Sequence, residues 1–271
     1  MNKFKTLTFV SCALLMSLTG CNSSKKEVIV FAAASMTETM NTIKANYEKA
    51  HSNVKITYNF DSSGTLKTQI ENGAACDLFI SAAPKQMNQL DIDSETEGAK
   101  DFIDHSTRLD LLENKVALAV RKEATDTVTS FTDLKDKLVN KEKGFVLAIG
   151  NSDVPVGQYT QKIFTYFGLN EEELNSAKLL TYGTNVKEVI TFVSQGTANC
   201  GIIYATDAYS ANLKVVDTAT KEMCGQVIYP AALLKNAPQK DLASEFLSYL
   251  QTEEAGKVFE GVGFTPLSTT K

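Results

Sequence analysis

Residues 28–35, VIVFAAAS, determine the fold class of this chain. The first six form a continuous apolar run, which is typical of a strand buried on both faces of a parallel sheet. Met36, Met40, Ile43 and Tyr47 then recur at helical spacing and predict an amphipathic helix directly after the strand. The folded part of the chain therefore begins with a strand, a junction of small residues and a helix.

The same alternation of short apolar strand, polar turn and amphipathic helix continues to the end of the chain. The predicted strands cover residues 28–33, 54–60, 78–82, 116–120, 145–149, 179–181, 201–205 and 227–234. The predicted helices cover residues 36–47, 66–71, 85–90, 131–139, 156–167, 186–193, 241–250 and 254–259. This pattern predicts an α/β fold with largely parallel sheets. Because 271 residues exceed one domain of the usual ~100–150, we expect two domains.

Residues 1–20 have the features of an export signal. After two lysines, residues 6–20 are apolar, a run too short for a spanning helix of ~20 residues but suited to a signal peptide. Residues 18–21, LTGC, resemble a bacterial lipobox, so we expect cleavage before Cys21 and lipidation of its thiol. Residues 21–27 would then form a lipidated tether at the membrane. The alternative is a plain signal peptide followed by an incidental cysteine.

The charge balance argues against a nucleic-acid partner. The chain carries 27 basic and 32 acidic side chains, a formal net charge of -5. Loss of the two lysines of the predicted signal leaves 25 basic against 32 acidic side chains, a net charge of -7. A protein that binds nucleic acid by general charge attraction is basic. The 43% of apolar and 22% of charged residues are typical of an ordinary globular protein.

Three cysteines remain once Cys12 is removed with the signal and Cys21 is lipidated: Cys76, Cys200 and Cys224. An odd number leaves at least one thiol outside any intramolecular disulfide. Their spacing matches no zinc or iron–sulfur pattern. A bridge between Cys200 and Cys224 stays open at an oxidising cell surface.

Four predicted strand-to-helix junctions are built from small or hydroxyl residues. Ligands of open α/β sheets lie at the carboxyl ends of strands, where helix N-termini offer unpaired N–H groups and a positive dipole end. Such a junction can hold an anion without a cationic side chain. Structural alternatives exist: Ser35 with Glu38, and Asn185 with Glu188, form helix-capping patterns. The junctions cover residues 31–36, 61–65, 151–157 and 182–186.

In combination these segments resemble the periplasmic molybdate-binding proteins, the receptors of molybdate ABC importers. The resemblance runs in order from about Val28 to Thr265. It rests on FAAAS at 31–35, SSGTL at 62–66, IENGA at 70–74, DLFISA at 77–82, VPVG at 154–157 and GIIYATDA at 201–208. It implies a two-lobed periplasmic-binding-protein fold of type II, with mixed, mostly parallel sheets flanked by helices and the oxyanion in the cleft. Lobe one would comprise residues 28–112 plus 229–271 and lobe two residues 113–228.

The resemblance also implies the groups that bind the oxyanion. Ser35 and Ser63 would donate hydroxyl and backbone hydrogens from lobe one, Val156 and Val186 backbone N–H groups from lobe two, and Tyr204 its phenolic O–H. The metal would be held only through its oxygens, without direct metal ligands, and no other cofactor is expected. The alternative for Tyr204 is a core tyrosine whose hydroxyl binds a backbone carbonyl. Val156 and Val186 would act through their amides, so their side chains carry no signal.

Protonation and size predict which oxyanion such a site selects. A fully deprotonated oxyanion offers only acceptors, whereas phosphate usually keeps a proton that needs an acceptor. Sulfate lacks a proton, so its exclusion would depend on size; molybdate and tungstate are too similar to separate. Asp61 could repel a dianion or accept a phosphate proton, and we expect its carboxylate to turn outward as a cap or solvated turn residue.

Other functions fit the sequence less well. His51 and His105 lie in polar stretches, no nucleophile elbow or P-loop is present, and Gly261-Val-Gly263 lacks the strand of a dinucleotide site. The export signal disfavours the effector domain of a transcription regulator. We therefore expect a monomeric, lipid-anchored, extracytoplasmic receptor without enzyme activity, which captures molybdate or tungstate for the permease of an ABC transporter. A binding lipoprotein for another oxyanion, such as sulfate or phosphate, is the alternative.

Overall fold

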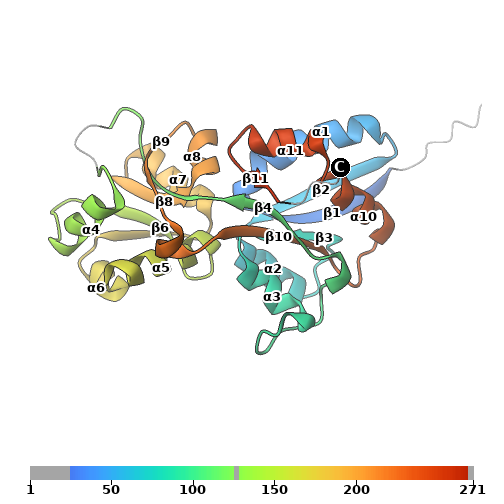
Figure 1. Ribbon diagram of the computed structural model, residues 1–271, viewed down its shortest axis with the longest axis horizontal. Coiled ribbons are helices and arrows are strands. Elements are labelled where there is room, and N and C mark those ends of the chain that lie inside the picture. Colours follow the sequence, from blue (N-terminus) through green and yellow to red (C-terminus); the bar gives the residue numbers. More distant parts are fainter. Residues whose placement is uncertain (1–24, 125–127, 268–271) are drawn as a thin grey trace, which may run out of the picture.

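The computed structural model describes residues 25–124 and 128–267, which form two lobes joined side by side (Figure 1). The strands of lobe one are β1 (Lys26–Ala33), β2 (Val54–Asp61), β3 (Leu78–Ile80), β4 (Leu109–Asn114), β10 (Val227–Leu233) and β11 (Thr265–Pro266). Those of lobe two are β5 (Val116–Val120), β6 (Leu147–Gly150), β7 (Leu180–Gly183), β8 (Cys200–Tyr204) and β9 (Lys214–Thr218). The predicted signal peptide at 1–20 and the lipidation site Cys21 lie outside the described residues.

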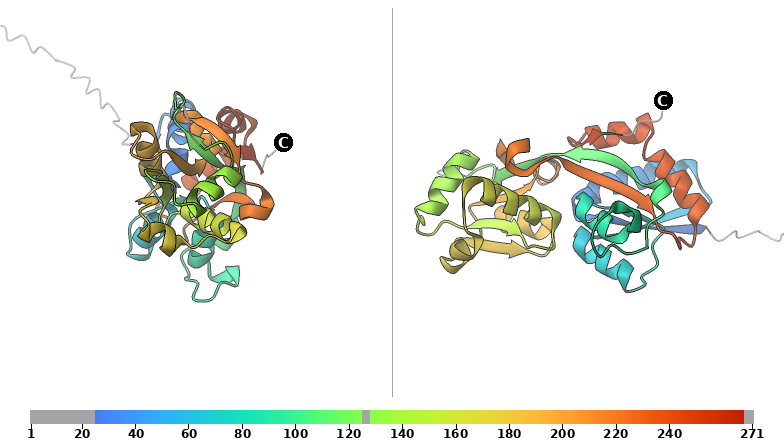
Figure 2. Two further views of the ribbon diagram at one scale, coloured as in Figure 1. Left: turned by 90° about the vertical axis from the view of Figure 1, so that its left-hand side faces the viewer. Right: turned by 60° about the horizontal axis from the view of Figure 1, so that its bottom comes forward.

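Helices flank both sheets (Figures 1 and 2). Lobe one carries α1 (Thr37–Ala50), α2 (Ser63–Glu71), α3 (Pro84–Leu90), α10 (Lys240–Tyr249), α11 (Glu253–Glu260) and the short 3-10 helices η1 (Ala34–Met36), η2 (Ile92–Ser94) and η3 (His105–Thr107). Lobe two carries α4 (Phe131–Val139), α5 (Pro155–Phe167), α6 (Glu171–Ser176), α7 (Val186–Gln195), α8 (Ala205–Ser210) and α9 (Lys221–Cys224). The mixed α/β fold predicted from the strand–helix alternation is confirmed.

Both sheets are mixed. The strand order is β11-β4-β10-β3-β1-β2 in lobe one and β7-β6-β8-β5-β9 in lobe two. β1 runs parallel to β2 and β3, and β6 runs parallel to β7 and β8. β10 runs antiparallel to β3 and β4, and β5 antiparallel to β8 and β9. The antiparallel share is larger than the sequence pattern predicted. β4, β9 and β11 were not recognised as strands, and the predicted strands β3 and β10, like β5 and β8, pair antiparallel.

The chain crosses between the lobes at two places that lie close together (Figure 2). Lys115 alone separates β4 of lobe one from β5 of lobe two, and α9 lies between β9 of lobe two and β10 of lobe one. The predicted lobe boundaries, after residues 112 and 228, fall inside β4 and β10; the division of the chain at these residues stays a prediction. Two adjacent crossings allow one lobe to rotate against the other.

The predicted core face of the first helix is confirmed, since Met36, Met40, Ile43 and Tyr47 are almost fully buried. Cys76, Cys200 and Cys224 are buried and free, so no Cys200–Cys224 bridge is formed. Burial raises the pKa of the Cys224 thiol, which keeps it protonated. None of the helices in the described residues is both long enough and apolar enough to cross a membrane.

Candidate functional site

A small cavity lies between the two lobes, at the carboxyl ends of β1, β2 and β8. Its volume of about 10 Å³ is far below the ~300–1,000 Å³ of pockets for drug-sized ligands. The residues that line it come from both lobes, and none of those described carries a charge: Ala33, Ala34, Ser35, Ser62, Ser63, Ala82, Val154, Pro155, Val156, Val186 and Tyr204. The structure thus brings all five predicted oxyanion-binding residues together. The cavity suits a small inorganic ion.

Two helices of lobe two begin at this interlobe cavity, each with a backbone N–H that no hydrogen bond within residues 25–124 and 128–267 occupies. In α5 the first residue is Pro155, which has no N–H, so the Val156 amide is the first donor of the helix. The N-cap residue of α5, Val154, makes no side-chain cap. In α7 the Asn185 side chain accepts the N–H groups of Lys187 and Glu188, at 3.0 and 3.2 Å. The Val186 amide is therefore left for the cavity, together with the positive end of the helix dipole.

The capping alternative for Ser35 is wrong. Met36 is the N-cap of α1, and no side chain caps this helix. Ser35 is buried in η1, and its Oγ lies 2.9 Å from the Tyr229 hydroxyl instead. Because the run of small residues before Ser35 ends in a 3-10 turn, Ser35 lines the cavity and does not cap α1.

The two adjacent serines at the start of α2 have different tasks. Ser62 is the N-cap, and its Oγ accepts the Thr65 N–H at 3.1 Å. Ser63 is fully buried, and its Oγ accepts the Ala82 N–H at 3.0 Å. That amide occupies a lone pair of the Ser63 oxygen, so the hydroxyl hydrogen remains for a partner in the cavity.

Tyr204 ends β8 as a nearly fully buried side chain. Its hydroxyl forms no hydrogen bond of acceptable geometry within the described part of the chain, although it interacts with the Tyr229 side chain. The predicted alternative of a phenol bound to a backbone carbonyl is not realised. Burial raises the pKa of Tyr204 well above 10, which keeps the phenol protonated. An unsatisfied buried hydroxyl costs free energy, and an acceptor in the cavity would remove that cost.

Asn114 and Tyr229 are connected to the site and were missed in the sequence. The Tyr229 hydroxyl binds Ser35 and accepts from Asn114 Nδ2 at 3.2 Å. Tyr229 belongs to a continuously apolar strand, where an aromatic residue is normally a core residue. Asn114 ends a strand that the sequence pattern did not reveal. No local signal distinguishes either residue, because Tyr229 reaches Ser35 through one hydrogen bond and Asn114 reaches it only through Tyr229.

Asp61 does not line the cavity. Its carboxylate accepts the Ser62 N–H at 2.7 Å and the Asn185 side-chain amide of lobe two at 3.5 Å. The expected outward, capping orientation is consistent with these contacts. An acceptor for a phosphate proton is therefore missing at this position.

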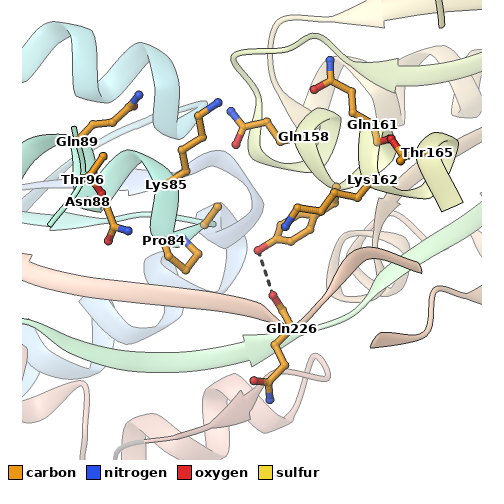
Figure 3. A pocket seen from close by; sticks show the side chains of 12 residues that line it. Pro84, Lys85, Asn88, Gln89, Thr96, Gln158, Gln161, Lys162, Thr165 and Gln226 are labelled. Atoms are coloured by element: carbon orange, nitrogen blue, oxygen red, sulfur yellow. Dashed lines mark hydrogen bonds between the residues drawn. The ribbon is translucent and has the colours of Figure 1, made fainter. Parts of the chain in front are cut away.

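A wider cleft adjoins the interlobe cavity, between α3 and α5. Figure 3 shows Lys85 and Gln158 extending into it from opposite lobes, and Lys162 lies 5.2 Å from the centre of the Tyr159 ring. None of the five predicted oxyanion-binding residues lines this cleft. The two lysines place positive charge at this wider cleft of a protein that is acidic overall.

Lys187 joins the two lobes through ion pairs. Its Nζ lies 2.8 Å from Glu38 of α1 in lobe one and 3.2 Å from Asp207 of α8 in lobe two. Asp207 is almost fully buried, and its Oδ2 has no partner in the described residues. Burial raises the pKa of Asp207 to about 7, while the Lys187 charge opposes this rise.

We expect Lys187→Met to lower stability more at pH 8 than at pH 6. A carboxyl group with a raised folded-state pKa reduces stability as the pH rises toward that pKa, and loss of Lys187 raises the pKa of Asp207 further. Below pH 7 the Asp207 carboxyl group is protonated in the folded state of both the native protein and the variant. At pH 8 the variant loses about 1 kcal/mol relative to the native protein, because each pH unit of ionisation is worth ~1.4 kcal/mol. Thermal unfolding at both pH values measures this, with Lys187→Arg as control; equal losses at both pH values would contradict it.

Comparisons with known proteins identify the family of this chain. The bacterial extracellular solute-binding protein family matches residues 28–265. YvgL of Bacillus subtilis (strain 168), whose name provisionally describes an ABC transporter substrate-binding lipoprotein, is 35% identical over 97% of this chain and 99% of its own. The molybdate-binding protein ModA of Haemophilus influenzae is 32% identical over 96% of this chain and 99% of its own.

A solved structure shows the same fold. The periplasmic molybdate-binding protein of Azotobacter vinelandii superposes with a TM-score of 0.73, at 19% identity, over 88% of this chain and 98% of its own. The two-lobed, type II periplasmic-binding-protein fold is thereby confirmed. Because the family match spans nearly all of the described residues, this chain belongs to the bacterial extracellular solute-binding proteins.

Proposed function

We propose that this protein captures molybdate outside the cytoplasm and delivers it to an ABC transporter. The observation that carries the proposal is the uncharged cavity, where two hydroxyls, the buried Tyr204 phenol and the first free amides of α5 and α7 come together. Such a set offers donors to a dianion that presents only acceptors. The ModA relatives named for molybdate binding support the choice of ion.

Size and protonation account for the selection. Hydrogen bonds to a charged partner contribute ~1.5–3 kcal/mol each, so an ion that loses one or two of them binds roughly tenfold to a thousandfold more weakly. Sulfate is smaller and leaves donors out of reach, and hydrogen phosphate brings a proton without an acceptor. Tungstate matches molybdate in size and charge, and we include it among the ligands. A role in transport, with no catalytic step and no further cofactor, follows from this proposal.

Calorimetry of the purified protein with molybdate, tungstate, sulfate and phosphate in parallel tests the function. We expect molybdate and tungstate to bind at least ~100-fold more tightly than the other two ions. If sulfate bound as tightly as molybdate, the protein would be a receptor for sulfate and size selection would be absent. Equal binding of phosphate would remove the argument from protonation.

Tyr204→Phe tests whether the Tyr204 hydroxyl contributes to binding of the ion. The change removes only the hydroxyl, which forms no hydrogen bond of acceptable geometry in the described protein, so folding should be unaffected or slightly improved. Molybdate affinity should fall by about tenfold through the loss of one charge-assisted hydrogen bond. Calorimetry and thermal unfolding give the two values. Unchanged affinity would exclude the phenol from the site.

A lipid anchor at Cys21 and a monomeric state belong to the same proposal. Support comes from the LTGC sequence at residues 18–21 and from the lipoprotein named among the relatives. Cys21→Ala should release the protein from the membrane fraction of the producing cell. Retention of the variant in that fraction would show that something other than the thiol holds it there.

A further inference from the structure

A chain of hydrogen bonds leads away from the interlobe cavity through buried, uncharged groups. Ser35 Oγ lies 2.9 Å from the Tyr229 hydroxyl, and Asn114 Nδ2 lies 3.2 Å from the same hydroxyl. Asn114 Nδ2 also lies 2.9 Å from Thr206 Oγ1, at the start of α8 in lobe two. Tyr229 is fully buried and Asn114 nearly so.

The direction of this chain is fixed at Asn114. The backbone N–H of Lys115 lies 2.8 Å from Asn114 Oδ1. A backbone N–H can only donate, so the atom that faces it must be the amide oxygen. The amide nitrogen of Asn114 therefore faces Tyr229 and Thr206, and it donates a hydrogen to each.

The hydrogen bond from Asn114 also determines which of Tyr229 and Ser35 donates to the other. Its oxygen receives the Asn114 N–H, and its own hydrogen is buried and needs an acceptor. Among the described residues, Asn114 and Ser35 are the partners whose distances and angles form hydrogen bonds with this hydroxyl. The nearby Tyr204 side chain also interacts with Tyr229, but its hydroxyl forms no hydrogen bond of acceptable geometry, and the Asn114 nitrogen cannot accept. Tyr229 therefore donates to Ser35 Oγ, and Ser35 presents its remaining hydrogen to the cavity. Ser63 is set in the same way by the Ala82 amide.

We propose that Asn114 is a specificity-determining residue that acts through Tyr229 and makes Ser35 a donor toward the bound ion. With Ser35 and Ser63 both directed outward as donors, a tetrahedral dianion that carries a proton meets hydrogens where it needs an acceptor. Asn114 thus selects against protonated oxyanions without contacting the ion. The inference rests on the proposed oxyanion-binding function and deepens it.

Selenate and hydrogen arsenate form a matched pair of probes. Both are tetrahedral dianions of similar size at pH 8, and only hydrogen arsenate carries a proton. The ratio of their dissociation constants therefore isolates the response to the proton from effects of charge and size. Tyr204 is the same in every variant, so its contribution cancels in comparisons of this ratio. We expect the native protein to prefer selenate by at least about tenfold.

Asn114→Asp reverses the direction of the chain. A carboxylate accepts the Lys115 N–H as before, but it also accepts the Tyr229 and Thr206 hydroxyls. Tyr229 then has its oxygen free to accept from Ser35, whose lone pairs turn to the cavity. The preference for selenate should fall by about tenfold or reverse. The added negative charge weakens both dianions alike and does not change the ratio.

Tyr229→Phe is a second test of the same inference. It remains decisive if the buried carboxylate introduced by Asn114→Asp prevents folding. It removes the hydroxyl that orients Ser35, so this serine can turn either way, and the preference should fall by roughly threefold to tenfold. Asn59→Asp is the charge control, because Asn59 of β2 donates to Gln69 and to no hydroxyl of the site. This control should keep the native ratio.

The outcomes separate the inference from the function. A native ratio near one, or a ratio unchanged in Tyr229→Phe and in folded Asn114→Asp, would overturn the role of Asn114. A change of the same size in Asn59→Asp would also overturn it, since charge alone would then be sufficient. Molybdate is titrated in parallel, and failure of the native protein to bind it would reject the proposed function instead.

Discussion

Gly64→Ala should lower molybdate affinity by about 100-fold or more and leave the folded lobes intact. Gly64 lies in the first turn of α2 in lobe one, and a Cβ at this position would lie 2.3 Å from the backbone oxygen of Asp153 in lobe two. A backbone oxygen cannot rotate away, so the methyl group prevents the closed approach of the lobes. The donors of α5 and α7 then fail to reach an ion held by Ser35 and Ser63.

Stability should not account for this loss. Alanine is a better helix former than glycine by ~1 kcal/mol, and the clash exists only between lobes, so thermal unfolding without ligand should be equal or slightly higher. Gly256→Ala is the matched control, because its Cβ meets only Pro266, at 3.8 Å. Small-angle scattering should show contraction on molybdate addition for the native protein and the control alone. If Gly64→Ala bound molybdate with native affinity, the backbone at Asp153 would be able to move away from the added methyl group at little cost in free energy.

The positions of the helix starts explain why the site could be predicted. Each predicted donor is either a hydroxyl or an amide at the end of a strand, and the ends of β1, β2 and β8 converge at one place. The residues FAAAS before α1 and VPVG before α5, interpreted through the family resemblance, therefore indicated residues that line one cavity. Pro155 marked the start of α5 correctly because its missing N–H costs nothing there.

The missed elements lack the pattern on which such predictions depend. β9 is an edge strand of largely exposed residues, so its composition does not alternate as a half-buried strand should. β4 follows a long polar segment and ends at Asn114. The role of Asn114 depends on its hydrogen bond to Tyr229, which lies 115 residues further along the chain. Hydrogen bonds over such separations depend on tertiary packing, and local sequence carries no sign of them.

Ser63→Ala and Ser62→Ala should separate binding from stability at adjacent positions. Ser63→Ala removes a hydroxyl donor of the cavity and leaves the buried Ala82 N–H without its acceptor. Molybdate affinity should fall by up to ~100-fold, and the free energy of unfolding by ~1–3 kcal/mol. Ser62→Ala removes the N-cap of α2, which costs ~1 kcal/mol of stability.

Because both variants lose stability, loss of fold cannot explain a difference in affinity between them. The Ser62 hydroxyl is already engaged, with the Thr65 N–H at 3.1 Å and with Thr65 Oγ1 at 2.9 Å. Its removal should change molybdate affinity by less than about threefold, since it contributes no charged hydrogen bond to the ion. Calorimetry and thermal unfolding on both variants give the comparison. Equal losses of affinity would mean that the order of α2 as a whole, rather than the Ser63 hydroxyl, controls binding.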